Sequence, residues 1–366
     1  MINMEPVLKR GYTFWDQALL PSDEFTERVR TVQAVMRKED VVGLAVFANS
    51  YENADISYLA GQAGGTLFMT TEGDPVLFTG GGGRELPFQR TLTWISELTS
   101  AGGGAGPKLQ EALQQRDITS GTVGLVGAHL LSKGAYDNIT KALSNYQLRE
   151  FDAQLRGVRA SKRPREVAAV RMALRIATDA AEAAEKAFSD GATTTKAMVA
   201  AERSARLDKA KDFRILANVD GDDLRPFEGL SDSGKSPLVM WIGLTYGGYW
   251  ADIAITFPSP LSNDATNAVA AMAAAARTGA KASDGAQAGL AKLSPAQRET
   301  ALSYGLGGGI GLAINDWPTI SPTSEAILVE GALLSLRTMA RDGDNVSFAN
   351  AIVQVGASGG VRLNPA

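Results

Sequence analysis

Apolar and polar residues follow two different periods along the first part of the chain. Residues 24–40 carry apolar side chains at steps of three and four, which predicts an amphipathic helix. Residues 41–49 and 121–127 are short, nearly continuous apolar runs, typical of strands covered on both faces. Residues 66–80 contain two β-rich runs around a turn and predict a hairpin. Helices and strands thus alternate to about residue 152, which indicates an α/β domain of three layers.

The pattern changes after this point. A long helix is predicted from Pro164 to just before Gly191, because apolar residues recur along one stripe between these two positions. A second helix is predicted after it. Residues 236–257 then form two β-rich runs that meet at Gly247 and Gly248, as in a hairpin.

The remaining segments are two predicted helices, starting near residues 262–264 and 294–295, and two strand-like runs at residues 331–340 and 345–356. This order predicts an α+β domain with helices on one face of a curved antiparallel sheet. We place the two domains at residues 1–155 and 156–366.

The amino-acid composition excludes several kinds of catalytic site, metal site and partner. The 366 residues include no cysteine, so thiolate nucleophiles, thiolate metal sites and disulfides are excluded. The only histidine, His129, follows an apolar run and is interpreted as structural, which disfavours most histidine-based catalysis. A net charge of −4 without basic runs argues against a nucleic-acid partner. With no signal-peptide pattern and no long apolar window, we expect a cytoplasmic protein without a membrane span.

Two glycine clusters, at residues 80–85 and 101–106, resemble phosphate-binding loops at first sight. Neither is followed by Lys and Ser/Thr or has the spacing of a dinucleotide fingerprint. We therefore interpret both clusters as flexible loops.

Four segments in order resemble the pita-bread family of creatinases, prolidases and Xaa-Pro aminopeptidases (peptidase family M24). Residues 23–65, with "YLAG" near their end, resemble the creatinase amino-terminal domain. "LRGVRASKRPREVAAVRMAL" is similar to the family's linker and first helix, "GLGGGIGLAINDWP" to its glycine-rich segment, and "VEGALLSLRTMA" to the stretch that carries a Glu-Pro pair. The resemblance implies a pita-bread α+β carboxy-terminal domain behind an α/β creatinase-type amino-terminal domain.

Metallopeptidases of this family hold two divalent cations with two Asp, one His and two Glu. The resemblance places these ligands on Trp241, Asp252, Gly308, Arg337 and Asn350 (Ala349 in a register shifted by one). Four of the five residue types cannot act as such ligands, and the guanidinium at position 337 repels cations. We therefore expect no metal cofactor, and no stoichiometric Mn, Co, Zn or Fe in the purified protein.

Asp252 and Arg337 are the candidate catalytic residues. Asp252 could act as a general base or as a nucleophile, and Arg337 could orient an anionic group. The alternative is a buried ion pair between the two that fills the former metal site. In both cases we expect Asp252 within salt-bridge distance of Arg337.

The remaining candidates are expected to line a substrate pocket. Aromatic side chains could wall a ligand or simply pack in the core, and polar side chains near the site need a ligand or a neighbour to satisfy them. Arg84 would reach the pocket as a second anion contact from a loop at its rim. The full set is Trp241, Trp250, Asn315, Asp316, Trp317, Asn350 and Arg84.

Two functions remain open. The first is a metal-independent enzyme acting on a small molecule, by C–N hydrolysis or by a proton-transfer step such as cyclisation, elimination or isomerisation. Creatinase and ectoine hydrolase, within the resemblance, act without metal. The second is a non-catalytic descendant that binds a ligand or a protein, as the histone-chaperone branch of the fold does. The resemblance also implies a homodimer in which one subunit's amino-terminal domain borders the other's pocket.

Overall fold

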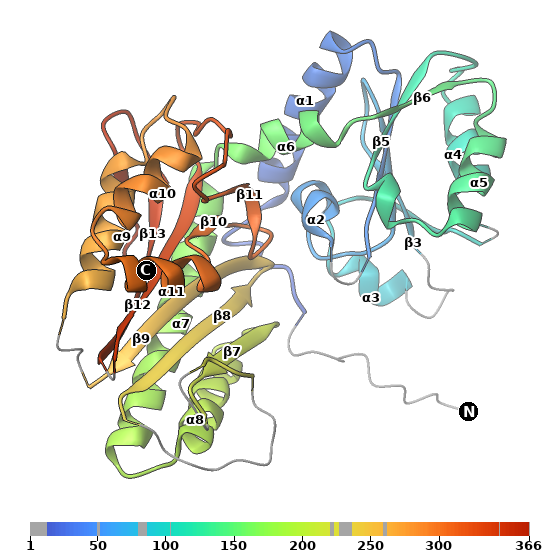
Figure 1. Cartoon of the computed structure of the whole chain (residues 1–366). Coiled ribbons are helices and arrows are strands. Elements are labelled where there is room, and N and C mark those ends of the chain that lie inside the picture. The colour runs from blue at the N-terminus through green and yellow to red at the C-terminus, as the bar shows by residue number, and fades with distance from the viewer. Residues whose placement is uncertain are drawn as a thin grey trace, which may run out of the picture. The chain divides into compact units, whose positions relative to one another are not determined.

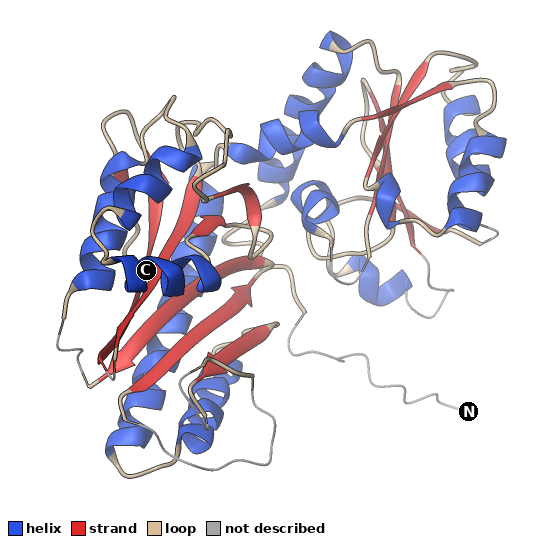
Figure 2. Ribbon diagram, viewed as in Figure 1, coloured by secondary structure: helices blue, strands red, loops and turns tan. Residues whose placement is uncertain are grey.

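The computed structural model describes residues 13–49, 52–79, 86–102, 104–219, 223–226, 236–258, 262–343 and 345–365. The chain divides between Arg159 and Ala160 into two units, each with its own contacts. Figures 1 and 2 show helices and strands in both units. None of the described helices is both long and apolar enough to cross a membrane.

The amino-terminal unit is built around a six-stranded mixed sheet of order β4-β3-β2-β1-β5-β6. β1 pairs antiparallel with β2 and parallel with β5, and β2–β3 is the predicted hairpin. Helices lie on both faces of this sheet (Figure 1), which confirms the three-layered α/β prediction. The strands are β1 (Gly43–Phe47), β2 (Thr66–Thr70), β3 (Val76–Thr79), β4 (Glu97–Ser100), β5 (Thr122–Val126) and β6 (Gln147–Glu150).

The helices of this unit join its strands. They are α1 (Ser22–Lys38), α2 (Ala54–Ala60), α3 (Leu86–Arg90), α4 (Ala105–Gln114), the 3₁₀ turn η1 (Ala128–Leu130), α5 (Lys133–Ala142) and α6 (Asp152–Ala160), which ends at the boundary. The flexible-loop interpretation of residues 101–106 is wrong for Ala105 and Gly106, which begin α4. A side chain at Gly106 would meet the backbone oxygen of Asn138 at 2.6 Å, so close packing against α5 requires glycine there. The other cluster, residues 80–85, lies outside the described residues.

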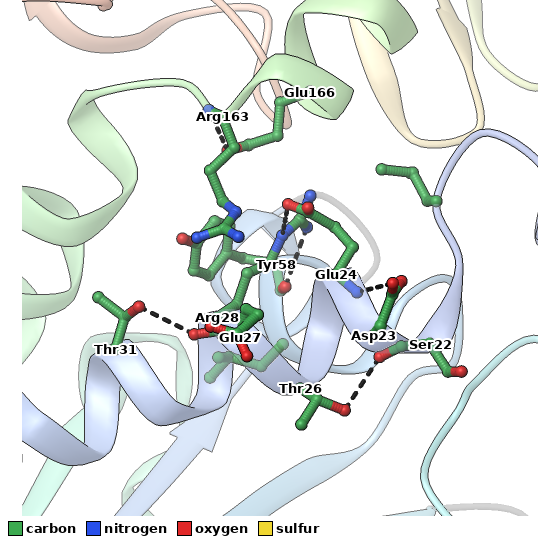
Figure 3. A network of polar contacts seen from close by, with 12 residues as sticks. Ser22, Asp23, Glu24, Thr26, Glu27, Arg28, Thr31, Tyr58, Arg163 and Glu166 are labelled. Atoms are coloured by element: carbon green, nitrogen blue, oxygen red, sulfur yellow. Dashed lines mark hydrogen bonds and ion pairs between the residues drawn. The ribbon is translucent and has the colours of Figure 1, made fainter.

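The carboxy-terminal unit contains a three-stranded sheet, β7-β8-β9, and a five-stranded sheet, β11-β10-β12-β13-β14. The long helix α7 (Pro164–Ser189) begins at the predicted proline and packs with α8 (Thr194–Leu207) and against β8 and β9. Its first turn is fixed by the Glu166 carboxylate, which accepts a hydrogen bond from the backbone N–H of Arg163 at 3.1 Å (Figure 3).

The second sheet carries the remaining helices. α9 (Asp264–Ala275) and α11 (Pro295–Tyr304) pack on β12, and α10 (Ala282–Leu290) packs on α9. Many alanines in these helices are fully buried, which allows close packing. The strands of both sheets are β7 (Phe213–Ala217), β8 (Leu238–Tyr246), β9 (Tyr249–Phe257), β10 (Gly307–Gly309), β11 (Asp316–Thr319), β12 (Leu333–Asp342), β13 (Asn345–Val355) and β14 (Gly360–Arg362).

Two hairpins meet in this unit. The β8–β9 hairpin turns at Gly247 and Gly248 as predicted, and β13 of the β12–β13 hairpin packs beside β9. Val239, Met339, Val346 and Phe348 form a small apolar cluster between them. Asp252, Arg337 and Asn350 of the candidate site lie on the same two hairpins.

Candidate functional site

Asp252 lies in the middle of β9 and is almost completely buried, with 1% of its surface exposed. One carboxylate oxygen, Oδ1, accepts a hydrogen bond from Ser335 Oγ at 2.7 Å and a longer one from Asn350 Nδ2 at 3.4 Å. The other, Oδ2, accepts a hydrogen bond from Trp241 Nε1 at 3.0 Å. Both oxygens of this buried charge are therefore satisfied by side chains from three other strands.

Strand register explains how these side chains converge. On β12, Ser335 and Arg337 are two residues apart and therefore point to the same face, and Arg337 lies directly opposite Asn350 on β13. On β8, Gly243 is the residue opposite Asp252, and Trp241 is its diagonal neighbour.

The glycine at position 243 makes room for the indole of Trp241. A Cβ atom there would lie 2.8 Å from the Trp241 ring and 2.6 Å from the side chain of Ile314. The indole can therefore cross over Gly243 and reach the Asp252 carboxylate.

Asn350 joins the two hairpins. Its Nδ2 donates to the backbone oxygen of Asp252 at 2.9 Å, and its Oδ1 accepts from the backbone N–H of Ala254 at 2.9 Å. The Asn350 side chain thus connects β13 with the backbone of β9, and both polar atoms of its amide are hydrogen-bonded within the protein.

Arg337 has a different environment from Asp252. Its Nη1 lies 3.8 Å from Asp252 Oδ2, which is ion-pair distance but too long for a hydrogen bond. The prediction that these two residues lie within salt-bridge distance is confirmed. The Arg337 side chain is 20% exposed, and among the described residues its guanidinium donates no hydrogen bond shorter than 3.5 Å. Its N–H groups are thus available on the side away from Asp252.

Arg337 lines two cavities. The larger, of about 540 Å³, has a largely apolar wall that includes Phe213, Ile215, Trp241 and Phe348. Arg214, Arg337 and Asn315 are the charged and amide side chains in the described part of that wall. Its volume is in the range of cavities that bind small organic molecules.

The smaller cavity, of about 240 Å³, is lined by Arg337, Asn315 and Asp316 together with Gly305, Gly307 and Gly308. Asp316 Oδ2 lies 3.6 Å from Lys162 Nζ, and both side chains are largely buried, at 10% and 5% exposed. Asn315 and Arg337 are common to both cavities and mark where the two lie next to each other.

The residues present do not form a dinuclear metal site. Within the described ranges, no group of three or more His, Asp, Glu or Cys side chains is arranged to hold a cation. A Cβ at Gly308, the position matched to the family's histidine, would lie 2.9 Å from the backbone oxygen of Pro318, so an imidazole would require β10 to move. At the five positions matched to metal ligands, the only charged side chains are thus one carboxylate, which is already hydrogen-bonded, and one guanidinium, which cannot bind a cation.

Comparison with known proteins agrees with this fold. The sequence model of metallopeptidase family M24 matches residues 168–364, more than half of the chain. The chain belongs to family M24. It is a divergent member that lacks the metal ligands, and its pita-bread fold with an α/β amino-terminal domain is as the sequence predicted.

Solved structures resemble this M24 chain over nearly its full length. They include a prolidase from Pyrococcus horikoshii (TM-score 0.75, 18% identity, 92% of this chain and 97% of that one). An X-Pro aminopeptidase from Thermotoga maritima follows (TM-score 0.71, 18% identity, 87% and 94%). The amino-terminal domain of FACT complex subunit SPT16 from Cicer arietinum also matches (TM-score 0.67, 15% identity, 93% and 96%). At these identities the likeness shows the fold alone. None of the curated proteins compared with this chain matches it.

The candidate residues of this M24 chain fall into different environments. Trp241, Asn315 and Asp316 line a cavity, whereas the described cavity walls do not include Trp250, Trp317 or Asn350.

The three residues have other contacts within the protein. Trp250 lies beneath the guanidinium of Arg214, with 4.6 Å between Arg214 Cζ and the ring centroid. The backbone of Trp317 packs against Gly309, and Asn350 is used between strands as described above. Arg84 lies outside the described residues. The binding roles of all these residues stay predictions.

The sequence reading missed Ser335, Arg214 and Lys162. Ser335 had a signal, since alternation along β12 places it on the same face as Arg337. Arg214 lies on β7, paired with β8, and Lys162 precedes α7. Neither has a pattern in the sequence that connects it with the site.

Proposed function

We propose that this M24 protein binds a small organic molecule in the larger cavity and does so without a metal ion. The observation that carries the proposal is Arg337. It stands where the resemblance places a metal-binding carboxylate, and its guanidinium faces the cavity with no hydrogen bond among the described residues. A wall of apolar side chains with a few convergent polar groups is typical of a ligand site.

Asp252 serves this site as the counter-charge that positions Arg337. Its carboxylate is 1% exposed, lines neither cavity in the described part of the chain, and has hydrogen bonds to both oxygens. A general base must reach the proton it removes, directly or through one water. The buried ion-pair interpretation of Asp252 is therefore better supported than the base or nucleophile interpretation.

A thermal-shift screen with a library of metabolites tests the proposal. A ligand at one hundred times its Kd stabilises the folded protein by about 2.7 kcal/mol, so a true ligand raises the Tm clearly. Leu216→Trp, which enlarges the β7 residue that lies opposite Trp241 on the same face, fills the cavity and should abolish the shift. Leu207→Trp, at a residue that is 76% exposed on α8, adds the same side chain away from the cavity and should leave it unchanged. A library without any stabilising compound, or equal shifts in both variants, would contradict the proposal.

A metal-independent enzyme is the second candidate. It is favoured by one observation: an acidic residue, Asp316, lines the smaller cavity together with Arg337. The reaction would be C–N hydrolysis or a proton transfer on a small molecule. If the protein is such an enzyme, Asp316→Asn should remove turnover of a ligand found by the screen while binding persists. Loss of turnover only in Asp252→Asn would instead restore the assignment of Asp252 as the base or nucleophile.

The resemblance also supports a homodimer with the Arg84 loop at the rim of the pocket, and we expect the protein in the cytoplasm. Light scattering after size-exclusion chromatography tests the dimer. Arg84→Gln should weaken ligand binding without lowering the Tm, and unchanged affinity would remove Arg84 from the site.

A further inference from the structure

We infer that the ligand of the larger cavity is an organic monoanion: a carboxylate attached to an aromatic or branched aliphatic body. The inference rests on the proposed function, since it names the class of molecule that the same cavity binds. Three observations carry it, namely the charges of the wall, the hydrogen bonds of its two arginines and the apolar side chains of the same wall.

The charged side chains in the described wall of the larger cavity are all cationic. Arg214 on β7 and Arg337 on β12 line it, and no described carboxylate does. A cavity with this wall disfavours cations and zwitterions that would place an ammonium group inside. It favours a ligand with an acidic group.

Both arginines retain hydrogen-bonding capacity. Arg214 Nη2 lies 3.9 Å from Asp212 Oδ2, and Arg337 Nη1 lies 3.8 Å from Asp252 Oδ2. These distances are ion pairs without hydrogen bonds. The planar guanidinium forks can therefore bind two oxygens of a carboxylate without breaking a hydrogen bond within the described protein.

The same two ion pairs limit the charge of the ligand. Each guanidinium already has one acidic neighbour, at 3.9 Å and 3.8 Å, so the positive charge that a ligand meets is reduced but not cancelled. A singly charged group gains the hydrogen bonds at little electrostatic cost. A phosphate dianion would bring excess negative charge close to Asp212 and to the buried Asp252.

The rest of the ligand is specified by the apolar wall. The same cavity is lined by six apolar or aromatic side chains: Phe213, Ile215, Leu216, Trp241, Ile314 and Phe348. Sugars and other polyhydroxylated molecules would lose hydrogen bonds to water against such a surface, whereas an aromatic ring or branched chain would bury apolar area. Asn315, next to Arg337, supplies an additional amide at the anionic end.

The experiment compares three probes that share a phenyl group: 3-phenylpropionate, 3-phenylpropionamide and phenyl phosphate. Titration is followed by tryptophan fluorescence, since Trp241 is in the wall, and by calorimetry. We expect the carboxylate to bind at least about ten-fold more tightly than the amide, as a charge-assisted pair implies, and more tightly than the phosphate, whose second charge would lie near Asp212 and Asp252.

Substitutions at Arg337 and Arg214 test whether these two side chains cause the preference for carboxylate over amide. Arg337→Gln should remove the preference for carboxylate over amide, and Arg214→Gln should reduce it. Arg337→Lys keeps the counter-charge for Asp252 but loses the planar guanidinium, so it should weaken carboxylate binding. This variant tests the role of Arg337 in case Arg337→Gln does not fold. Arg175→Gln on α7, which removes a partly exposed arginine paired with Asp179, is the matched control and should bind like the unmodified protein.

The outcomes separate the inference from the proposed function. Equal binding of amide and carboxylate, tighter binding of phenyl phosphate, or binding unaffected by both Arg337 variants would overturn the carboxylate class while leaving a ligand-binding cavity. Failure of all three probes, with a different class of ligand found in the metabolite screen, would also overturn it. Failure of both the probes and the screen would overturn the proposed function itself.

Discussion

Arg28 in the amino-terminal unit and Arg337 in the carboxy-terminal unit are both arginines paired with a buried acid, yet their surroundings differ. Arg28 is fully buried. Its Nε donates to Glu24 Oε1 at 3.1 Å and its Nη1 donates to the backbone oxygen of Tyr58 at 3.1 Å (Figure 3). Its guanidinium also lies 5.0 Å from the ring centre of Phe25 and 4.8 Å from that of Tyr58. Arg337 has only its 3.8 Å ion pair among the described residues.

The difference separates an arginine that holds the fold from one that is available to a ligand. Arg28 donates hydrogen bonds from Nε and Nη1 and lies close to two aromatic rings inside the unit, in the manner of a core residue. Arg337 has its charge balanced by Asp252 while its donors face two cavities. A buried ion pair alone therefore does not indicate a site; the unused donors beside a cavity do.

The largest effect is expected from removing Arg28. Arg28→Met leaves the Glu24 carboxylate, only 7% exposed, without this partner, and should lower the stability of the unit by about 3–5 kcal/mol. Arg30→Met on the same helix breaks an exposed pair with Glu27 and should cost less than about 1 kcal/mol. Native-state hydrogen exchange of the α1 amides measures both. Similar values for the two variants would show that Arg28 does not hold the fold.

A smaller effect is expected at Arg337. Arg337→Met removes the ion pair, but Asp252 keeps its hydrogen bonds from Trp241, Ser335 and Asn350, so the loss should be about 1–2 kcal/mol. Arg337→Glu places two carboxylates together and should cost about 2–4 kcal/mol. Arg362→Glu, on an exposed residue of β14, controls for the charge change. Urea unfolding gives these values, and a stability loss for Arg337→Met equal to that of Arg28→Met would remove the distinction drawn above.

Asp264 offers a third kind of charged group, satisfied by hydrogen bonds near the surface. Gln297 Nε2 and Ser262 Oγ donate to it, both at 2.8 Å, and these bonds lower the pKa of its carboxyl group below the ordinary value. A lowered folded-state pKa stabilises the protein above the unfolded-state value of about 4, and this contribution is lost as the pH falls through the folded-state pKa.

Asp264→Asn should therefore destabilise the protein by less than about 1 kcal/mol at pH 7, after allowance for solvent screening, and by less still at pH 3. Urea midpoints for the variant and the unmodified protein across this pH range measure the difference. A difference that stays constant with pH would show that the charge of Asp264 is not the stabilising feature.

The smallest effect is expected from chelators. If Arg337 has replaced a metal ligand in function as well as in position, EDTA or phenanthroline should leave the Tm and ligand affinity unchanged, because one hydrogen-bonded carboxylate cannot neutralise a pair of dications. Elemental analysis should give far less than one Mn, Co, Zn or Fe per chain. A stoichiometric metal would contradict the proposed function directly.

Local pattern predicted most of the elements. The Pro164 helix, the hairpin at Gly247 and Gly248, and the β2–β3 hairpin follow from periodicity and turn residues, whose effects act within a few positions of the chain. The loop interpretation of Ala105 and Gly106 was wrong because a contact distant in the sequence, rather than the local pattern, decides their structure. There, glycine is required by a neighbouring helix distant in sequence, and this cannot be distinguished from loop glycine by composition.

The sequence by itself determined which residue types are present at the former metal positions, and hence that a carboxylate and a guanidinium would have to balance each other. Only the tertiary structure decided which side chains contact Asp252 and which line the cavity. Ser335, Trp241 and Asn350 reach Asp252 from three strands, and Arg214 reaches the cavity from a fourth. Contacts between strands depend on sheet packing and register, which no single segment encodes. The sequence thus predicts the charges, and the packing of two hairpins decides that Asp252 is enclosed while Arg337 faces a cavity.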